Sequence, residues 1–383
     1  MSLILATLHS IGRAFSSRAR TESTPDGQTS GGVRASKRRP ASTQPRHVTL
    51  RDWLLTVVIA LSVAFIIRGF LLEAFRIPTT SMEKTLLAGD FVLVSKVHYG
   101  PRLPQRIGIP FTDLFIEGLE LPPLRLPGFA EPRRGDIIVF NFPLEDKPVA
   151  RKTHYIKRLI ALPGDSLTIL NKIPYVNGRP MPLSSSMQQK WLAIRELDTP
   201  FPIGRLESKG VEDVGRAGPM LDAVSFQSTV AVAQEVGSWR EIETIVPFVV
   251  PADAGYPTNI FPVGSGFGTD NYGPIYIPAQ GQSVELNASS LAMYRDVIER
   301  YEGHELTELA DGVVQLDGEF VSHYVFEQDY YFVMGDNRDS SYDSRIWGFV
   351  PWNHVVGKAT TIYFSWNREQ GGPRTDRMFT AIY

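Results

Sequence analysis

The sequence predicts a mainly β protein of two lobes, carried on an N-terminal transmembrane helix. Three observations predict this fold. A long apolar segment lies near the N-terminus, between residues 53 and 67. Beyond it the chain breaks into short runs rich in Val, Ile, Tyr and Phe, bounded by Gly, Pro and Asp, which is typical of strands. The length of 383 residues exceeds one ordinary compact domain and leaves room for an anchor and two lobes.

Residues 1–51 are predicted to form a basic, disordered tail on the cytoplasmic side. Residues 16–49 are rich in Ser, Thr, Gly, Pro and Arg, whereas residues 1–15 carry apolar side chains at helical spacing that suit a membrane surface. Nine Lys and Arg against two acids in this tail keep the N-terminus cytoplasmic. The same composition resembles an organellar transit peptide, so a bacterial origin is preferred and an organellar one stays open.

Residues 52–73 form the predicted transmembrane helix. About 20 apolar residues cross the hydrocarbon layer, and Arg68 can extend its charge to the headgroups. Because the segment is apolar on all faces, a buried helix of a soluble protein explains it less well. The predicted topology is single-pass, with everything after residue 72 on the outer side of a bacterial inner (cell) membrane.

The β core is predicted in two parts, residues 74–170 and 326–366. An inserted second lobe of residues 171–325 separates them, and a C-terminal tail of residues 367–383 follows. Residues 99–134 are crowded with Pro and Leu and indicate a loop or ribbon excursion. One helix is predicted in the inserted lobe, at residues 288–301. The predicted strands lie at residues 91–94, 136–140, 155–162, 166–170, 330–334 and 359–364.

Composition excludes several classes of site. The formal net charge of −2 argues against a nucleic-acid-binding surface, which requires a basic excess. Without cysteine there is no disulfide, no thiolate metal site and no cysteine nucleophile. The seven histidines are scattered, with no HExxH pair for zinc and no GxSxG elbow for a serine triad. We therefore expect no metal, no cofactor and no nucleic-acid partner.

Ser81 is the candidate nucleophile. It lies in the hydroxyl-rich stretch Ile-Pro-Thr-Thr-Ser-Met, just beyond the predicted membrane segment. A serine needs a base within hydrogen-bond reach, at about 2.6–3.2 Å. The backbone N–H of Ser81 and the hydroxyl of Thr79 are the candidate donors to an oxyanion.

Lys157 is the candidate base, because it lies inside an apolar, strand-like run. Apolar neighbours would desolvate its ammonium, and burial lowers the pKa of a lysine by up to about 3–5 units. The adjacent Arg158 cannot serve, since guanidinium does not deprotonate. The strand by itself also fits a lysine whose amine lies in solvent.

The charged turn at residues 335–345 supplies further partners. Ser341 is expected to orient Lys157, while Asp343 and Arg345 are expected to pair and hold the loop. A solvated turn is the alternative for such a cluster of Asn, Asp and Ser.

These segments resemble the bacterial type I signal peptidases, which are membrane-anchored serine proteases with a Ser/Lys dyad. Four motifs match in order: IPTTSM at residues 77–82, RGDIIVF at 134–140, YIKRLIALPGD at 155–165 and GDNRDSSYDSRIWGFVP at 335–351. Four linked motifs are far more specific than any single one.

The resemblance implies a signal-peptidase-like two-lobed β fold and assigns site residues. Ser81 matches the nucleophile, Lys157 the general base and Thr79 the oxyanion donor, and Ser341 matches the hydroxyl that orients the lysine. Asp343 and Arg345 match the supporting pair of the family. Narrow apolar pockets for small side chains, which favour Ala-x-Ala before the cut, fall on Phe75, Ile77, Met82, Leu86, Val139, Tyr155 and Ile156.

The implied function is removal of N-terminal signal peptides from exported preproteins through an acyl-enzyme. The implied enzyme is a monomer that contacts membrane lipid and uses no cofactor. Two alternatives stay open: a peptidase of the same fold with a narrower substrate, as in conjugation or pilin maturation, and a non-catalytic membrane-anchored protein that binds extended peptides.

Overall fold

The computed structural model describes residues 49–383, apart from 104–105, 109–114, 121–123, 197–198, 217–221, 252–258, 310–311 and 369. The predictions made for residues 1–48, a disordered tail and an apolar first segment, lie outside the described residues.

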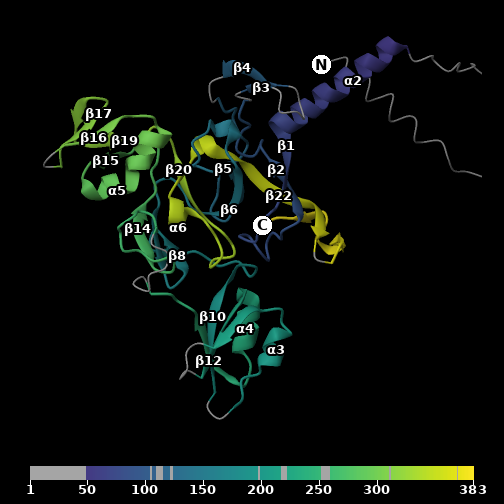
Figure 1. Cartoon of the computed structure of the whole chain (residues 1–383), viewed down its shortest axis with the longest axis vertical. Coiled ribbons are helices and arrows are strands. Elements are labelled where there is room, and N and C mark those ends of the chain that lie inside the picture. Colours follow the sequence, from purple (N-terminus) through teal and green to yellow (C-terminus); the bar gives the residue numbers. More distant parts are fainter. Residues whose placement is uncertain are drawn as a thin grey trace, which may run out of the picture. The chain divides into compact units, whose positions relative to one another are not determined.

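The first described element is the apolar helix (Figure 1). Helix α2 (Leu50–Ile66) continues as a π-helical turn, η1 (Ile67–Leu71), and Thr49 caps it, because its hydroxyl accepts a hydrogen bond from Asp52 N at 3.2 Å. None of its side chains is buried in the protein. Together the two segments make 22 residues, which is long and apolar enough to cross a membrane.

A nine-stranded antiparallel sheet forms the centre of the β body. The predicted strand at residues 166–170 lies in a smaller sheet, and the other five predicted strands lie in the central one. Two of them, β6 and β20, come from opposite sides of the inserted lobe and are neighbours. The spatial order is β1 (Leu72–Arg76), β2 (Asp90–Ser95), β22 (Val355–Asn367), β5 (Ile137–Asn141), β6 (His154–Ala161), β20 (Tyr330–Met334) and β21 (Val350–Pro351), with β23 (Gly372–Pro373) and β24 (Thr380–Ala381) on β22.

Short helices close the connections around this sheet. They are η2 (Val149–Arg151), α6 (Ser344–Trp347), η6 (Trp352–His354) and η7 (Thr375–Arg377). The segment after β22 folds back on the sheet, where Arg377 Nη2 donates to the buried Asp90 carboxylate at 2.6 Å. Within residues 99–134, β3 (Arg106–Gly108) pairs with β4 (Phe115–Glu120), so part of this excursion is a two-stranded ribbon.

Apart from residues 188–247, the described part of the region from β7 to β19 consists of small sheets and the helix predicted at residues 288–301. The helix is α5 (Ala288–Asp296), extended by the π-helical η4 (Val297–Tyr301), and Asn287 caps it through a capping box. The sheets are β14 (Tyr272–Tyr276) with β7 (Ser166–Leu170), β8 (Ile173–Val176) and β9 (Arg179–Pro180); β15 (Ser283–Glu285) with β19 (His323–Val325); and β16 (Leu306–Glu308) with β17 (Val314–Leu316) and β18 (Glu319–Val321).

Residues 188–247 form a module with its own apolar core, which we call the inserted module. Its four-stranded sheet packs against two helices, and its core includes Trp191, Phe226 and Trp239. The sheet order is β11 (Glu212–Arg216), β12 (Ala223–Thr229), β10 (Gln188–Arg195) and β13 (Ile242–Pro247), and the helices are α3 (Ile203–Glu207) and α4 (Val230–Gly237).

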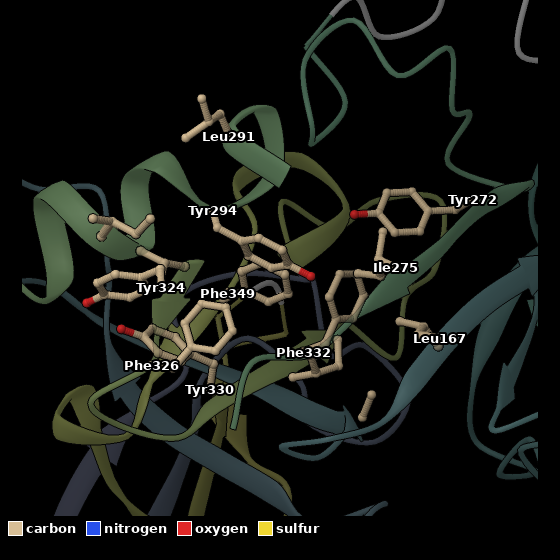
Figure 2. Packing of buried hydrophobic residues seen from close by; sticks show 14 of the residues in the cluster. Leu167, Tyr272, Ile275, Leu291, Tyr294, Tyr324, Phe326, Tyr330, Phe332 and Phe349 are labelled. Carbon is tan, nitrogen blue, oxygen red and sulfur yellow. The ribbon is translucent and has the colours of Figure 1, made fainter. Parts of the chain in front are cut away.

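An aromatic cluster joins the central sheet to the α5 region (Figure 2). The ring of Tyr294 on α5 lies 5.3 Å from that of Phe326 and 6.0 Å from that of Phe349, between centroids. Tyr330 on β20 completes the group, 6.4 Å from Phe349. The predicted second lobe therefore shares this core with the β core, whereas the inserted module has a core of its own.

Replacing Phe326 by alanine is expected to destabilise the protein by about 3–5 kcal/mol, because it leaves a cavity in a packed aromatic core. Phe326 is only 1% exposed. The measurement is the urea midpoint of the detergent-solubilised protein. Phe320→Ala is the matched control, since Phe320 is 70% exposed and its loss should change stability by less than about 0.5 kcal/mol. Equal effects of the two substitutions would contradict this packing.

Candidate active site

The Ser81 turn follows strand β1 and is fixed by backbone bonds and by buried side chains. Glu83 N donates to Thr80 O at 2.9 Å, and Leu86 N donates to Met82 O at 2.7 Å. Met82 and Leu86 are fully buried, which holds the turn from within the core. Ser81 itself is 9% exposed, so its hydroxyl lies at the edge of the protein interior.

Lys157 lies on β6, and its side chain reaches the Ser81 hydroxyl. Its Nζ forms a hydrogen bond with Ser81 Oγ at 2.5 Å, across a sequence separation of 76 residues. Only 4% of Lys157 is exposed, and its Nζ lies 5.8 Å from the centroid of the Tyr155 ring. The alternative of a strand lysine with its amine in solvent does not describe this side chain.

Burial lowers the pKa of Lys157 to about 8. The carboxylates of Asp343 and Asp336 act in the opposite direction and raise this pKa, whereas the charge of Arg345 lowers it. The amine is therefore substantially neutral near and above pH 8, the state in which nitrogen can accept a proton.

A buried ion pair that the sequence reasoning missed lies beside the lysine. Arg158 donates from Nε and Nη2 to the two carboxylate oxygens of Asp336, each at 2.7 Å. Asp336 Oδ2 also accepts a hydrogen bond from the Thr85 hydroxyl at 2.7 Å. The pair thus ties the strand of Lys157 to the helical turn after Ser81. The sequence pointed to this pair only in that Arg158 and Asp336, of opposite charge, lie in two of the matched motifs.

Asp343 and Arg345 form a second buried ion pair. Arg345 Nε donates to Asp343 Oδ1 and Arg345 Nη2 donates to Asp343 Oδ2, each at 2.9 Å. Burial alone would raise the pKa of Asp343, but the charge and hydrogen bonds of Arg345 lower it. Asp343 Oδ2 also accepts from Gly335 N at 3.0 Å, and Arg345 Nη2 donates to the carbonyl of Arg338 at 2.6 Å. The two side chains therefore hold the turn at residues 335–345.

Ser341 lies in the same turn, next to the Ser81 segment. Its hydroxyl is buried and forms no hydrogen bond of standard geometry in the described part of the chain, although it is near enough to Asp343 to help lower the pKa of that carboxyl. Among the described residues Ser341 thus makes no hydrogen bond to Lys157, and its orienting role stays a prediction.

Two donors at the Ser81 turn make no hydrogen bond to any residue that the structure describes. They are the backbone N–H of Ser81 and the hydroxyl of Thr79, whose side chain is exposed. Both lie within two residues of the Ser81 hydroxyl in the sequence. This arrangement suits the oxyanion role expected for them, which remains a prediction.

The seven residues predicted to line substrate pockets come together around the Ser81 turn. Six of them belong to one apolar cluster, and Tyr155 packs on the adjacent cluster. Four are fully buried and three are half-buried, so the half-buried Phe75, Tyr155 and Ile156 are the ones that present surface to a ligand. The buried four are Ile77, Met82, Leu86 and Val139.

Metal ligands were not expected, and no group of three or more His, Asp or Glu is placed to hold a metal ion among the described residues.

An apolar anchor, a β fold, and a serine whose hydroxyl meets a buried lysine define the class of membrane-anchored serine endopeptidases. The chain belongs to the signal peptidase family, peptidase S26, whose family profile matches residues 50–216 and 275–366. It is 28% identical to the Signal peptidase I of Haemophilus influenzae over 340 residues, which cover 86% of this chain and 75% of that protein. It is 26% identical to the Signal peptidase I of Helicobacter pylori over 320 residues, 82% of this chain and 81% of that protein. With the Signal peptidase I of Aquifex aeolicus it shares 25% identity over 333 residues, 87% of this chain and 91% of that protein.

Adding one methyl group at Gly335 is expected to disable the site. A Cβ there would lie 2.2 Å from Ser341 Oγ and 2.4 Å from the Ser81 carbonyl oxygen, so the two turns would have to separate. We expect Gly335→Ala to lower peptidase activity by about 100-fold, the order of loss caused by displacing a reacting group by 1 Å. The assay is cleavage of a preprotein in detergent. Gly204→Ala is the control, because a Cβ at Gly204 meets nothing within 4 Å, and normal activity of Gly335→Ala would contradict the geometry.

Proposed function

We propose that this protein is a membrane-bound serine endopeptidase that removes N-terminal signal peptides from exported preproteins, using Ser81 as nucleophile and Lys157 as general base. The observation that carries the proposal is the 2.5 Å hydrogen bond between Ser81 Oγ and Lys157 Nζ, in a site where burial lowers the pKa of Lys157 to about 8. The names of the Signal peptidase I relatives support the choice of substrate.

The reaction follows from these groups. The neutral amine of Lys157 accepts the Ser81 hydroxyl proton while Oγ attacks the scissile carbonyl. The resulting oxyanion accepts hydrogen bonds from the Ser81 N–H and the Thr79 hydroxyl. The ammonium of Lys157 then returns its proton to the leaving amine, and the signal peptide remains as an ester on Ser81. Water, deprotonated by the same amine, hydrolyses the ester and regenerates the serine.

The substrate enters as an extended strand, which brings alternate side chains to the same face. Ile77, Met82 and Val139 are buried in the apolar cluster under the Ser81 turn, so a large substrate side chain would have to overpack this cluster, whereas a small one would not. This supports cleavage after Ala-x-Ala sequences, with Phe75, Tyr155 and Ile156 in contact with the peptide. Ser341 acts in this scheme as the hydroxyl that orients the lysine.

The anchor places this chemistry at a membrane. Helix α2 with η1 crosses the bilayer once, the basic residues before it stay in the cytoplasm, and the catalytic body lies on the outer side of the bacterial inner membrane. The enzyme works as a monomer in contact with lipid, and its β core comprises residues 74–170 and 326–366. A peptidase with a narrower set of preproteins shares this site. A non-catalytic peptide-binding protein fits less well, since a buried amine is unfavourable without a role.

Removing either member of the dyad is expected to abolish cleavage. Ser81→Ala loses the nucleophile, and Lys157→Arg retains a cation but cannot accept a proton. Each should lower kcat by at least about 10³-fold, the order seen when a nucleophile or its base is removed. The measurement is cleavage in detergent of a preprotein with Ala-x-Ala at its junction. Ser322→Ala and Lys147→Ala, both on the surface, are the controls, and undiminished cleavage by either dyad variant would sink the proposal.

The pH profile is expected to report the lysine. Because Lys157 acts as the neutral amine and its pKa is lowered to about 8, activity should rise with pH and level off above about 8. Below that midpoint kcat/KM should fall by about tenfold per pH unit as the amine becomes charged. The profile is measured with a preprotein substrate, alongside thermal stability at each pH. Activity that persists on acidification to pH 5 would argue against a neutral lysine base.

A further inference from the structure

The inserted module contacts the catalytic turns through three of its strands. Gln188 on β10 forms a parallel bridge with Asn337, in which Gln188 N donates to Asp336 O at 2.9 Å and Arg338 N donates to Gln188 O at 2.8 Å. Glu212 on β11 accepts an ion-paired hydrogen bond from Lys84 at 2.7 Å. Lys84 follows Ser81 by three residues, so the module reaches both sides of the serine.

Asn337 connects these contacts to the serine turn. Its backbone N–H donates to the Ser81 carbonyl at 3.1 Å, and its side-chain Nδ2 donates to the Thr80 carbonyl at 3.2 Å. Asn337 is 2% exposed, and the Thr80 carbonyl also accepts a hydrogen bond from Glu83 N at 2.9 Å. Asn337 therefore contacts the peptide groups on both sides of the Ser81 Cα, the first of them together with Glu83.

Gln227 on β12 determines which way the Asn337 amide points. Its Nε2 donates to Asn337 Oδ1 at 2.9 Å, and Gln227 is itself buried. Because an amide has its acceptor at one end and its donors at the other, engaging Oδ1 directs Nδ2 toward the Thr80 carbonyl. Gln227 therefore acts on the Ser81 turn without contacting it.

We propose that Gln227 is a positioning residue for Ser81, acting through Asn337, so that the inserted module sets the geometry of the nucleophile. The inference rests on the proposed function, which makes Ser81 the nucleophile. Gln227 lies between the two segments that match the family profile, residues 50–216 and 275–366. Its effect is on the orientation of Ser81 Oγ toward Lys157 Nζ, with no contact to substrate.

The test compares two substitutions at residue 227 in the full-length protein in detergent. Gln227→Leu removes the hydrogen-bond donor and keeps a similar side-chain volume. Gln227→Glu places a carboxylate oxygen opposite Asn337 Oδ1, so that two acceptors meet and the Asn337 amide has to turn away from Thr80. We expect kcat to fall about tenfold in Gln227→Leu and further in Gln227→Glu, with KM changed by less than about twofold, since small displacements of a reacting group act on the chemical step. The rate of Ser81 labelling by a serine-directed covalent probe should fall in parallel, while the midpoint of the pH profile stays in place.

Gln189→Leu is the matched control. Gln189 is a buried amide on β10 of the same module, and its Nε2 makes no hydrogen bond within the described residues. Its substitution should leave kcat and labelling unchanged. Three outcomes would overturn the positioning role. Gln227→Leu could keep the wild-type kcat, Gln189→Leu could lose kcat to the same extent, or the loss of kcat in Gln227→Leu could follow a lowered melting temperature. Ser81→Ala separates the two proposals: if it is inactive while Gln227→Leu is fully active, the positioning role alone is wrong, and if it is active, both are wrong.

Discussion

The desolvation of one amine is the constraint on which the rest of the site depends. Lys157 is surrounded by protein, and two carboxylates, Asp336 and Asp343, lie near enough to raise its pKa. A free carboxylate beside a buried lysine would hold the proton on the amine. Here each carboxylate has its own arginine, Arg158 for Asp336 and Arg345 for Asp343, so burial outweighs their attraction. The two ion pairs therefore favour the neutral form of the amine that we propose as the base, and they also hold the loops together.

The same pairs explain why distant segments of the chain meet. Asp336 and Asp343 flank the turn that carries Asn337 and Ser341, while Arg158 is the immediate neighbour of Lys157 on β6. Gly335 lets this turn approach the Ser81 carbonyl without a side chain between them. Breaking a buried pair leaves an uncompensated charge, which typically costs about 3–5 kcal/mol. The site thus has its geometry and its electrostatics fixed by the same few contacts.

Local pattern was sufficient to predict the strands, the apolar helix and the helix at residues 288–301. Strands are recognised from runs of β-branched and aromatic residues that end at Gly, Pro or Asp. These features involve only residues that are neighbours in the sequence. The proximity of Ser81 and Lys157 was also predictable, because matched motifs fix it. What the sequence did not reveal depends on distant pairing: the Arg158–Asp336 ion pair, the separate core of the inserted module, and the amide of Gln227 against Asn337. A glutamine in a strand has many possible partners, and no local signal selects one. The roles predicted for Thr79, Ser341 and the pocket residues remain predictions.

The position of strand β22 has a consequence for biosynthesis. β2 and β5, both made early, are not neighbours in the sheet; β22 lies between them and pairs with each. The sheet cannot close until the ribosome has delivered residues 355–367, well after the anchor and the serine have been made. Pairings that wait for a late segment have a high loop-closure entropy and form slowly. In the nascent chain Ser81 and Lys157 therefore stay apart for most of synthesis, and the proposed dyad assembles as one of the last events of folding.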